Sequence, residues 1–326
     1  EVPSYICAYA AATLAAQAGL LGLFGEIPLT AKLPVSIPGL AEQGSSLNRP
    51  RYDMQLQSAS QEEKFTEAVK VIRDAIADSV FPGAQICIVD DGKIVFSKGF
   101  GKQTYDEHSA PIDTGTMFDM ASVTKVTVTT AVAMRLYDQG VLRLDIPVRS
   151  YLPRFSGGMK DSVTVRHLLT HSAGILWWDS LWEKVDSKEE VIDYICDLPL
   201  VYVPGDSMIY SDLGILLIGE ILQTITGKPL DQLSREMYFE PLGMTSTMYN
   251  PPSEMLPVIA PTEIGGSMNR GLIHGTVHDE NAFFLGGVAA HAGLFSTAED
   301  MAVFSQMLIN GGIYRQIRFL KKQTVQ

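Results

Sequence analysis

Ser122 and Lys125 form the only S-x-x-K sequence in this chain, and this pair of side chains can support nucleophilic catalysis. An apolar run, residues 117–121, leads into a predicted helix, on which a residue three positions further on lies one turn along the same face. A serine becomes an effective nucleophile when a neighbouring base takes its proton. A lysine can be that base when burial or a nearby cation favours its neutral form. The spacing therefore predicts serine-based acyl transfer, with a surface serine and lysine on an ordinary helix as the alternative.

A second group of side chains has the chemistry to bind a metal ion. Five residues of ligand type lie within eighteen positions: His274, His278, Asp279, Glu280 and His291. On a helix, the four-residue spacing of His274 and His278 would present two imidazoles to one metal. Gly275 lies between them, however, and the glycines nearby favour a loop, where this spacing matches no metal-binding motif. The pattern leaves a metal-dependent hydrolase as an alternative to the serine hydrolase.

The elements that must position Ser122 and Lys125 begin with a helix and a hairpin. Apolar side chains recur at helical spacing across Gln61–Asp78 and predict an amphipathic helix. Two apolar runs, Gln85–Val89 and Lys93–Ser97, are separated by Asp-Asp-Gly, a strong hairpin signal. A helix followed by antiparallel strands favours an α+β sheet domain over a doubly wound one.

Most of the remaining chain is predicted to be helical. A helix entered after Met120 is expected to run to about Tyr137 and to stop at Gly140. Further helices are expected at residues 163–170, 188–196, 214–226, 230–237 and 297–310. The run 291–304 is expected to be a loop that enters the last of these helices. After Gly312 the sequence predicts neither a further strand pair nor a closing helix.

Composition and charge exclude several functional classes. The chain has 326 residues, of which 46% are hydrophobic and 19% charged, as in a folded protein with a real core. Its 25 basic and 37 acidic residues give a net charge of −12, and no basic stripe is present, so we expect no nucleic-acid partner. Three scattered cysteines without C-x-x-C spacing support neither a zinc site nor a disulfide framework. We expect no cofactor.

The first fifty residues differ in character from the rest. Tyr5–Gly25 is uncharged over 21 residues, long enough to raise the question of a membrane span. No Lys or Arg precedes Lys32, so the basic flank of a signal peptide or of a span is missing. We therefore expect a short buried strand and a buried helix here, and no transmembrane segment in this chain.

Four ordered segments resemble the serine β-lactamase and penicillin-binding-protein superfamily, especially its class C β-lactamase-related branch. They are FDMASVTK (118–125), VLRLDIPVRSYLP (141–153), VTVRHLLTHSAG (163–174) and PGDSMIYSDLGILLIGEIL (204–222). The resemblance implies a β-lactamase/DD-peptidase-like α+β fold over residues 60–326. In that fold an antiparallel sheet is flanked by helices, and an α-helical subdomain completes the site.

The resemblance also implies roles for individual residues. Ser122 would be the acylated nucleophile, Lys125 its partner, and Tyr210 the second-motif tyrosine that shuttles the proton as base and then as acid. Asp212 stands where the family usually has Asn, and an ionised Asp only accepts hydrogen bonds. Beside Lys125 it would favour the charged ammonium and oppose its use as a base. This substitution weakens the case for β-lactams or peptides and leaves ester substrates open.

The C-terminal third of the chain carries a further resemblance and a departure. GLIHGTVHDENAFFLGGVAAHAGLFSTAED (271–300) is similar to β-lactamase-related domains fused to family-three glycosidases. We expect this loop to border the active-site cleft, with His278 near the substrate. His291-Ala292-Gly293 has the letters of the family's third motif, H-x-G, but in this context we do not assign it that role. The third motif and the last strands are expected to be missing from this chain.

The run AYAAATLAAQAGLLGLFGEIPLTAKLPVSIPG (8–39) is similar to the C-terminal end of family-three glycoside hydrolases of the β-N-acetylglucosaminidase type, with Ala31 replacing a usual glycine, and residues 1–43 are assigned to it. This resemblance implies a remnant of an upstream glycosidase domain, followed by a linker at 44–59 and by a β-lactamase-related hydrolase domain at 60–326, truncated before its last strands. It also implies a glycosidase domain upstream in the parent polypeptide. Exported relatives suggest the cell envelope or periplasm as the compartment.

The sequence as a whole predicts a serine hydrolase that works through a Ser122 acyl-enzyme. Its expected substrate is a β-lactam, a cell-wall peptide or a small ester, which includes peptidoglycan-derived molecules. The first alternative is an inactive or binding module of a larger cell-wall fusion protein. The second is the metal-dependent hydrolase built on the histidine group.

Overall fold

The computed structural model describes Ser36, Gln43, Gly44 and residues 62–326. The predicted glycosidase remnant at 1–43, the uncharged stretch within it and the linker at 44–59 therefore lie almost wholly outside the described residues. Within the described part, no single helix is long and apolar enough to cross a membrane. The bent pair formed by Asp212–Thr226 and Leu230–Leu242 passes that test by length and composition alone, with a 76° bend.

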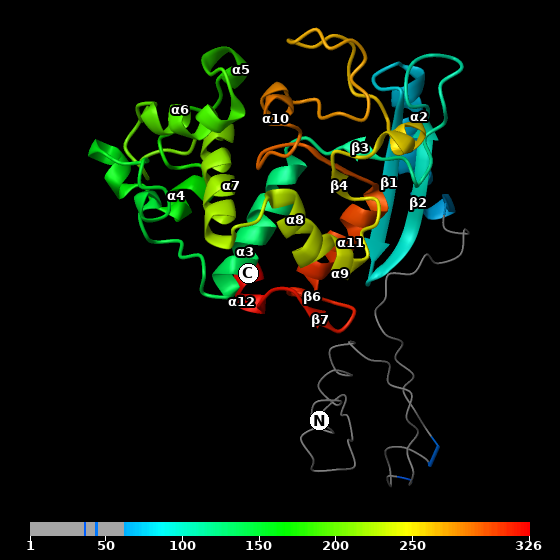
Figure 1. The fold of residues 1–326 in the computed structure, drawn as a ribbon. Helices are drawn as coiled ribbons and strands as arrows, with labels where there is room; N and C mark the ends of the chain where they lie inside the picture. The colour runs from blue at the N-terminus through cyan, green and yellow to red at the C-terminus, as the bar shows by residue number, and fades with distance from the viewer. Residues whose placement is uncertain (1–35, 37–42, 45–61) are drawn as a thin grey trace.

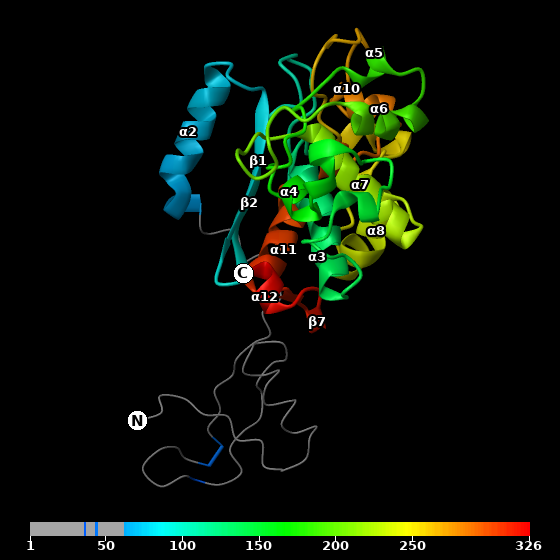
Figure 2. The same cartoon turned by 90° about the vertical axis from the view of Figure 1, so that its left-hand side faces the viewer.

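The N-terminal part of the domain is the predicted helix and hairpin. A short 3₁₀ turn, η1 (Glu62–Phe65), leads into α2 (Thr66–Ala77), and β1 (Gly83–Asp90) pairs antiparallel with β2 (Lys93–Gly101). Asp91 and Gly92 both have positive φ, 47° and 73°, which is the geometry of a two-residue hairpin turn. Figure 2 shows α2 covering one face of the hairpin, where Val69 packs with Phe96 and Phe100. The helix and hairpin predictions are confirmed.

A small three-stranded sheet lies directly before the nucleophile. Its order is β3 (Phe118–Asp119), β5 (Leu294–Ser296) and β4 (Met248–Tyr249), and both pairings are antiparallel. The prediction of a loop from 291 into the following helix is wrong over 294–296. Three residues are too few to show a strand period, and their pairing partners lie far away in the sequence. Helix α11 (Ala298–Ile309) follows, capped by the Thr297 side chain.

The helix that carries Lys125 begins irregularly. A π-helical stretch, η2 (Lys125–Thr130), continues directly into α3 (Ala131–Asp138), which ends before Gly140 as predicted. Val128 and Val132 are fully buried, so this helix runs through the middle of the molecule. Figure 1 shows α3 between the helices at the left and the β1–β2 hairpin at the right. A π-bulge at such a position is frequent at functional sites.

The helical subdomain lies on the other side of α3 from the hairpin (Figure 1). Its longest member, α7 (Asp212–Thr226), is buried over most of its length and ends at Gly227 in the left-handed conformation. The other helical segments of this part and of the connections are η3 (Val148–Ser150), η4 (Gly158–Ser162), α4 (Val165–Leu169), α5 (Leu181–Lys184), η5 (Lys188–Glu190), α6 (Val191–Asp197), α8 (Leu230–Ser234), η6 (Arg235–Phe239), α9 (Glu240–Leu242), η7 (Ser253–Val258) and α10 (Glu280–Phe284). The five further predicted helices are all present.

The C-terminal end corrects another prediction. After Gly312 the chain forms a short hairpin, β6 (Ile313–Tyr314) with β7 (Ile317–Arg318), and a short helix, α12 (Lys322–Val325). The expectation of no further strand pair or closing helix is therefore wrong. Arg315 and Gln316 make the turn with positive φ, 45° and 63°, a conformation that usually requires Asn or Gly. The usual sequence signal of the turn is thus absent.

Gly219 marks the closest packing between α7 and the segment that leads to His291. A Cβ atom at Gly219 would lie 2.6 Å from Ala290 Cβ, whereas one at Gly214, on the same helix, would meet only ordinary contacts. Overpacking costs about 1–3 kcal/mol, against a helix-propensity gain of about 1 kcal/mol. We expect Gly219→Ala to lower the free energy of unfolding in urea and Gly214→Ala to leave it unchanged or raise it. Equal stability of the two variants would contradict this packing.

Thr124 fastens the nucleophile helix to β5. Its buried hydroxyl oxygen accepts a hydrogen bond from the Leu294 backbone N–H at 3.2 Å, whereas the equally buried Thr127 hydroxyl contacts only the Met301 sulfur at 3.8 Å. Thr124→Val should cost about 1–3 kcal/mol, because it leaves a buried N–H without a partner. Thr127→Val, the matched control, should cost less, since sulfur is a weak acceptor. Urea denaturation of both variants measures the difference, and a larger loss for Thr127→Val would refute the assignment.

Candidate active site

The turn before the helix presents Ser122 to solvent. Ala121, which precedes it, has a φ of 43°, a left-handed conformation that costs a non-glycine residue about 1–2 kcal/mol. Two contacts hold it: Asp119 Oδ1 accepts from the Ala121 N–H at 2.8 Å, and the Met120 N–H donates to the Leu294 carbonyl at 2.8 Å. Ser122 is exposed, and among the described residues its backbone N–H has no hydrogen-bond acceptor. The nucleophile is thus open to a substrate, with a free donor at the same residue.

Lys125 lies directly behind Ser122 and is only 5% exposed. Its ammonium contacts three oxygen atoms: Ser122 Oγ at 2.7 Å, the His291 carbonyl at 3.0 Å and Asp212 Oδ1 at 2.8 Å. The contacts with Ser122 Oγ and the His291 carbonyl are hydrogen bonds, whereas the contact with Asp212 is an ion pair without hydrogen-bond alignment. The structure therefore confirms that Ser122 and Lys125 are in hydrogen-bond contact. It also brings in the His291 backbone, which the sequence did not indicate.

Tyr210 lies beside Lys125, just before α7. The face of the Tyr210 ring, rather than its hydroxyl, contacts the Lys125 ammonium. Lys125 Nζ is 4.9 Å from the ring centroid, a cation–π distance, and Tyr210 is 48% exposed. Within the described residues, no hydrogen bond joins the Tyr210 hydroxyl to Ser122 or Lys125. The structure thus brings the three predicted catalytic residues together. The proton-shuttle role of Tyr210 stays a prediction.

His171 supports Tyr210 and was not singled out from the sequence. The two rings lie 4.6 Å apart between centroids, and His171 Nδ1 accepts a hydrogen bond from the Ser211 backbone N–H at 3.1 Å. Burial lowers the pKa of His171, the Lys125 charge lowers it further, and Asp212 opposes both. The neutral ring therefore carries its proton on Nε2. The segment HLLTHSAG contains this residue and was the available signal.

Asp212 is the first residue of α7. Ser211 caps the helix, its hydroxyl oxygen accepting from the Gly214 N–H at 3.0 Å, while the Asp212 N–H donates to the Trp177 carbonyl at 2.9 Å. A carboxylate in the first turn is stabilised by the helix dipole, and here it also pairs with the Lys125 ammonium. The expected contact between Asp212 and Lys125 is confirmed. Its predicted role in substrate binding stays a prediction.

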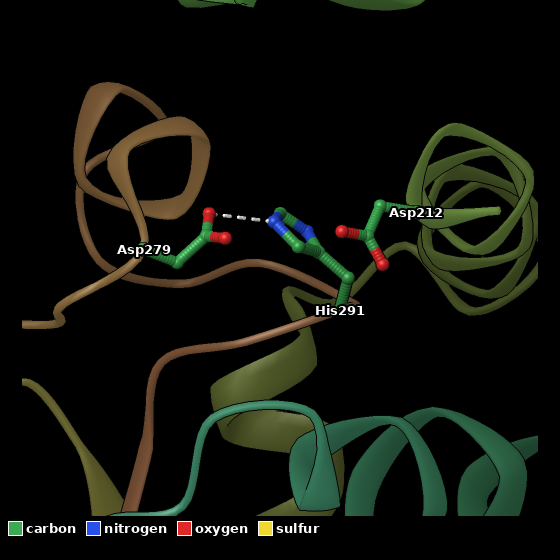
Figure 3. Close-up of side chains that lie close together, drawn as sticks. All are labelled: Asp212, Asp279 and His291. Atoms are coloured by element: carbon green, nitrogen blue, oxygen red, sulfur yellow. Dashed lines mark hydrogen bonds and ion pairs between the residues drawn. The ribbon is translucent and has the colours of Figure 1, made fainter. Parts of the chain in front are cut away.

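His291 forms a pair with Asp279 and lies between it and Asp212 (Figure 3). His291 is 1% exposed, and its Nε2 lies 2.8 Å from Asp279 Oδ1. The same carboxylate oxygen caps α10 by accepting from the Ala282 N–H at 2.8 Å. Burial raises the pKa of Asp279, but the hydrogen bond and charge of His291 outweigh it, so the pKa of Asp279 is lowered overall. The histidine that was not assigned to the third motif therefore contributes both its carbonyl and its ring to this region.

The histidine-rich run is dispersed by the fold. His274 Nε2 lies 3.0 and 2.8 Å from the carbonyls of Leu256 and Ile259, and His278 Nε2 pairs with Glu263 at 2.6 Å. The five residues of the predicted metal group are therefore not brought together, and only Asp279 and His291 of that group are in contact. The run is a loop interrupted by the short helix α10, so His274 and His278 point to different partners.

One set of three ligand-type atoms within 4.8 Å of one another is found in the part of the chain described: Asp212, Asp279 and His291. These residues have the donor chemistry to hold a divalent cation. However, the Lys125 ammonium lies 2.8 Å from Asp212 Oδ1 and would repel a second cation there. The arrangement favours a network of charged side chains over a metal centre.

The loop that contains His278 is tied to the strand before the nucleophile. The His278 backbone N–H donates to Asp119 Oδ2 at 2.7 Å, and the Arg270 guanidinium donates to the carbonyls of Val277 and His278. Burial raises the pKa of Asp119, and its hydrogen bonds from His278 and Ala121 oppose this rise. The loop thus borders the turn that holds Ser122. Whether the His278 ring meets a substrate stays a prediction.

Two relatives match about three quarters of the chain. A putative D-alanyl-D-alanine carboxypeptidase of Escherichia coli (strain K12) is 34% identical over 285 residues, covering 76% of this chain and 65% of the relative. An N-acetylmuramyl-L-alanine amidase of Bacillus subtilis (strain 168) is 36% identical over 276 residues, covering 75% of this chain and 63% of the relative. The chain thus spans slightly less than two thirds of either protein.

The fold is shared with a solved structure, and a family model covers the described domain. The octameric penicillin-binding protein homologue from Pyrococcus abyssi superposes with a TM-score of 0.66 at 27% identity, covering 80% of this chain and 58% of that one. The beta-lactamase family model matches residues 68–325. The expected α+β fold of the β-lactamase and DD-peptidase type is confirmed, and the chain belongs to the beta-lactamase family.

Proposed function

We propose that this chain is a serine hydrolase that acts through an acyl-enzyme on Ser122. The observation that carries the proposal is the 2.7 Å contact between Lys125 Nζ and Ser122 Oγ, made by a buried lysine and an exposed serine. A serine hydroxyl next to an amine base is the arrangement that nucleophilic catalysis requires. The N–H of Ser122, which has no acceptor within residues 62–326, adds a donor for the oxyanion that forms on the substrate carbonyl.

In the proposed reaction, neutral Lys125 takes the Ser122 hydroxyl proton as Oγ attacks the carbonyl carbon of the substrate. The bond to the leaving group breaks, and the leaving group takes a proton from Lys125 or through Tyr210, whose ring lies beside the amine. A water molecule then attacks the ester on Ser122 by the same proton path in reverse. The acid product leaves, and the serine hydroxyl is restored.

The relatives favour a peptidoglycan-derived substrate among the candidate classes. Those two matched proteins are named as a putative D-alanyl-D-alanine carboxypeptidase and an N-acetylmuramyl-L-alanine amidase. A beta-lactam, like a cell-wall peptide, would transfer an acyl group from an amide nitrogen to the serine. A small ester would transfer its acyl group more readily, because an alcohol is a better leaving group than an amine. We therefore propose cell-wall peptides as the natural class, with penicillin and ester reagents as chemical probes. The upstream glycosidase domain implied for the parent polypeptide fits a cell-wall role.

Active-site labelling tests this function directly. A fluorescent fluorophosphonate or penicillin should attach covalently to Ser122, and Ser122→Ala should abolish the label, because the nucleophile is lost. Lys125→Met should slow labelling by about 10²–10⁴-fold, the usual contribution of a general base. Ser162→Ala, at a surface serine in η4, is the matched control and should label normally. Peptide mass spectrometry after labelling locates the modified residue.

The same experiment separates the alternatives. A chelator should not change labelling, since no step uses a metal. A wild-type chain that no reagent labels would refute the acyl-enzyme and favour a binding module. A label on another serine would refute the assignment of Ser122, and loss of turnover with a chelator would favour the metal-dependent hydrolase.

A further inference from the structure

The pairing of Asp212 with Lys125 poses a chemical problem for the proposed reaction. Lys125 must lose a proton before it can act as a base, yet Asp212 Oδ1 lies 2.8 Å from its ammonium nitrogen. A carboxylate so close favours the charged form of a lysine. An asparagine, neutral at this position, would not have this effect. Something else in the site must therefore balance the charge of Asp212 when Lys125 is neutral.

The His291 ring occupies the position where such a balancing group would act. Figure 3 shows the imidazole between the two carboxylates, with one nitrogen bonded to Asp279 and the other turned to the side of Asp212. That second nitrogen, Nδ1, is buried and has no hydrogen-bond partner, and Asp212 Oδ1 also receives no well-aligned hydrogen bond. Atoms of Asp212, Asp279 and His291 lie within 4.8 Å of one another. A buried polar nitrogen without a hydrogen bond costs folding free energy, so the missing partner of His291 Nδ1 calls for an explanation.

The charges around His291 come from three elements. Asp279 faces it from the start of α10, Asp212 from the start of α7, and Lys125 from the nucleophile helix through the His291 carbonyl. Asp119 is close enough to feel the charge of Asp279 and accepts hydrogen bonds from backbone N–H groups, while His171 feels the charges of Lys125 and Asp212. Carboxylates on both sides of an imidazole favour its charged form. The group therefore consists of two carboxylates, Asp212 and Asp279, and two bases, Lys125 and His291, which share one dissociable proton.

We propose that His291 is a positioning residue that accepts, through Asp212, the proton that Lys125 must lose. The inference rests on the proposed function of Ser122 and Lys125. One N–H bond of the Lys125 ammonium breaks, the Asp212 carboxylate carries the proton, and an N–H bond forms at His291 Nδ1. The net charge of the four side chains does not change. Rotation about the Lys125 Cε–Nζ bond then turns the lone pair towards Ser122 Oγ, and the imidazolium is held between Asp212 and Asp279.

Asp279 has two tasks in this arrangement. By accepting from Nε2–H it leaves Nδ1, the other ring nitrogen, as the site that can gain a proton. Its negative charge then stabilises the imidazolium that results. The lowered pKa of Asp279 means that this carboxyl is ionised across the neutral range, as the second task requires. With Asp279 stabilising a protonated His291, Asp212 can lie next to Lys125 while Lys125 acts as a base.

Asp279→Asn is the variant that tests this relay with the least disturbance. Asparagine is as good a helix cap as aspartate and still accepts from the Ala282 N–H and from His291 Nε2–H, so only the charge is removed. We expect the labelling rate of Ser122 near neutral pH to fall about tenfold or more, and its rise with pH to move to higher pH. Urea denaturation checks that the variant is folded.

The double variant makes the test specific. In an Asp212→Asn background the carboxylate that holds the lysine proton is gone, so Asp279→Asn should change neither the rate nor the pH profile further. Equal effects of Asp279→Asn with and without Asp212 would show a merely structural role and would overturn the relay. An unaltered pH profile in the single variant would overturn it as well.

Nitrogen NMR of the histidine rings gives a readout that needs no substrate, with His291→Gln used to assign the signal. We expect both ring nitrogens of His291 to carry protons near neutral pH in the wild-type chain, and one to lose its proton in Asp279→Asn. A neutral His291 in a wild-type chain that is labelled normally would overturn the inference alone. Failure of the wild-type chain to label at all would overturn the proposed function, and the positioning role of His291 with it.

Discussion

The structure around the active site depends on one buried positive charge, the Lys125 ammonium. Removing an ammonium from water costs several kcal/mol unless its donors are all satisfied. Here the ammonium donates hydrogen bonds to Ser122 Oγ and to the His291 carbonyl and forms an ion pair with the Asp212 carboxylate, and these three oxygens come from three separate segments of the chain. The nucleophile turn, the start of α7 and the segment before β5 must therefore meet at one point. The surrounding fold keeps these three segments in contact.

Each of the three segments is fixed by its own local contacts. The turn before Ser122 is held by the side chain of Asp119 and by the pairing of β3 with β5. Asp212 is placed by the Ser211 cap of α7, and His291 by the bond of its ring to Asp279 at the start of α10. The pairing of β5 with β3 also brings the His291 carbonyl to the lysine. Helix starts and a very short strand thus do the positioning, while the long helices supply the core.

The replacement of an amide by a carboxylate at position 212 changes the electrostatics of the site. A neutral amide both donates and accepts, but Asp212 only accepts and adds a negative charge beside the lysine. The structure shows a second carboxylate and a buried imidazole next to it, so the change at 212 is surrounded by groups able to balance it. In this view the protonation states of Asp212, Asp279, His291 and Lys125 are coupled, so a change at one of the four side chains affects the other three.

The sequence predicted those features that depend on neighbours along the chain. The helix of residues 66–77, the hairpin turn at Asp91-Gly92 and the contact of Ser122 with Lys125 follow from local periodicity and spacing, and the structure confirms them. Strand β5 was not predicted, because its three residues are defined by pairing with strands far away in sequence. The contributions of His171 and His291 were not predicted for the same reason. Ser211, the partner of His171, is 40 residues away, and Asp279, the partner of the His291 ring, is 12 residues away.

A crystal structure of the chain after reaction with a slowly hydrolysed penicillin would test the central claim most directly. The account predicts a covalent bond from Ser122 Oγ to the carbonyl carbon, with the carbonyl oxygen accepting from the Ser122 N–H. Lys125 Nζ would still lie beside Ser122 Oγ, Asp212 and the His291 carbonyl. Penicillin bonded at any other residue, or a Lys125 side chain turned away from the acylated serine, would contradict it.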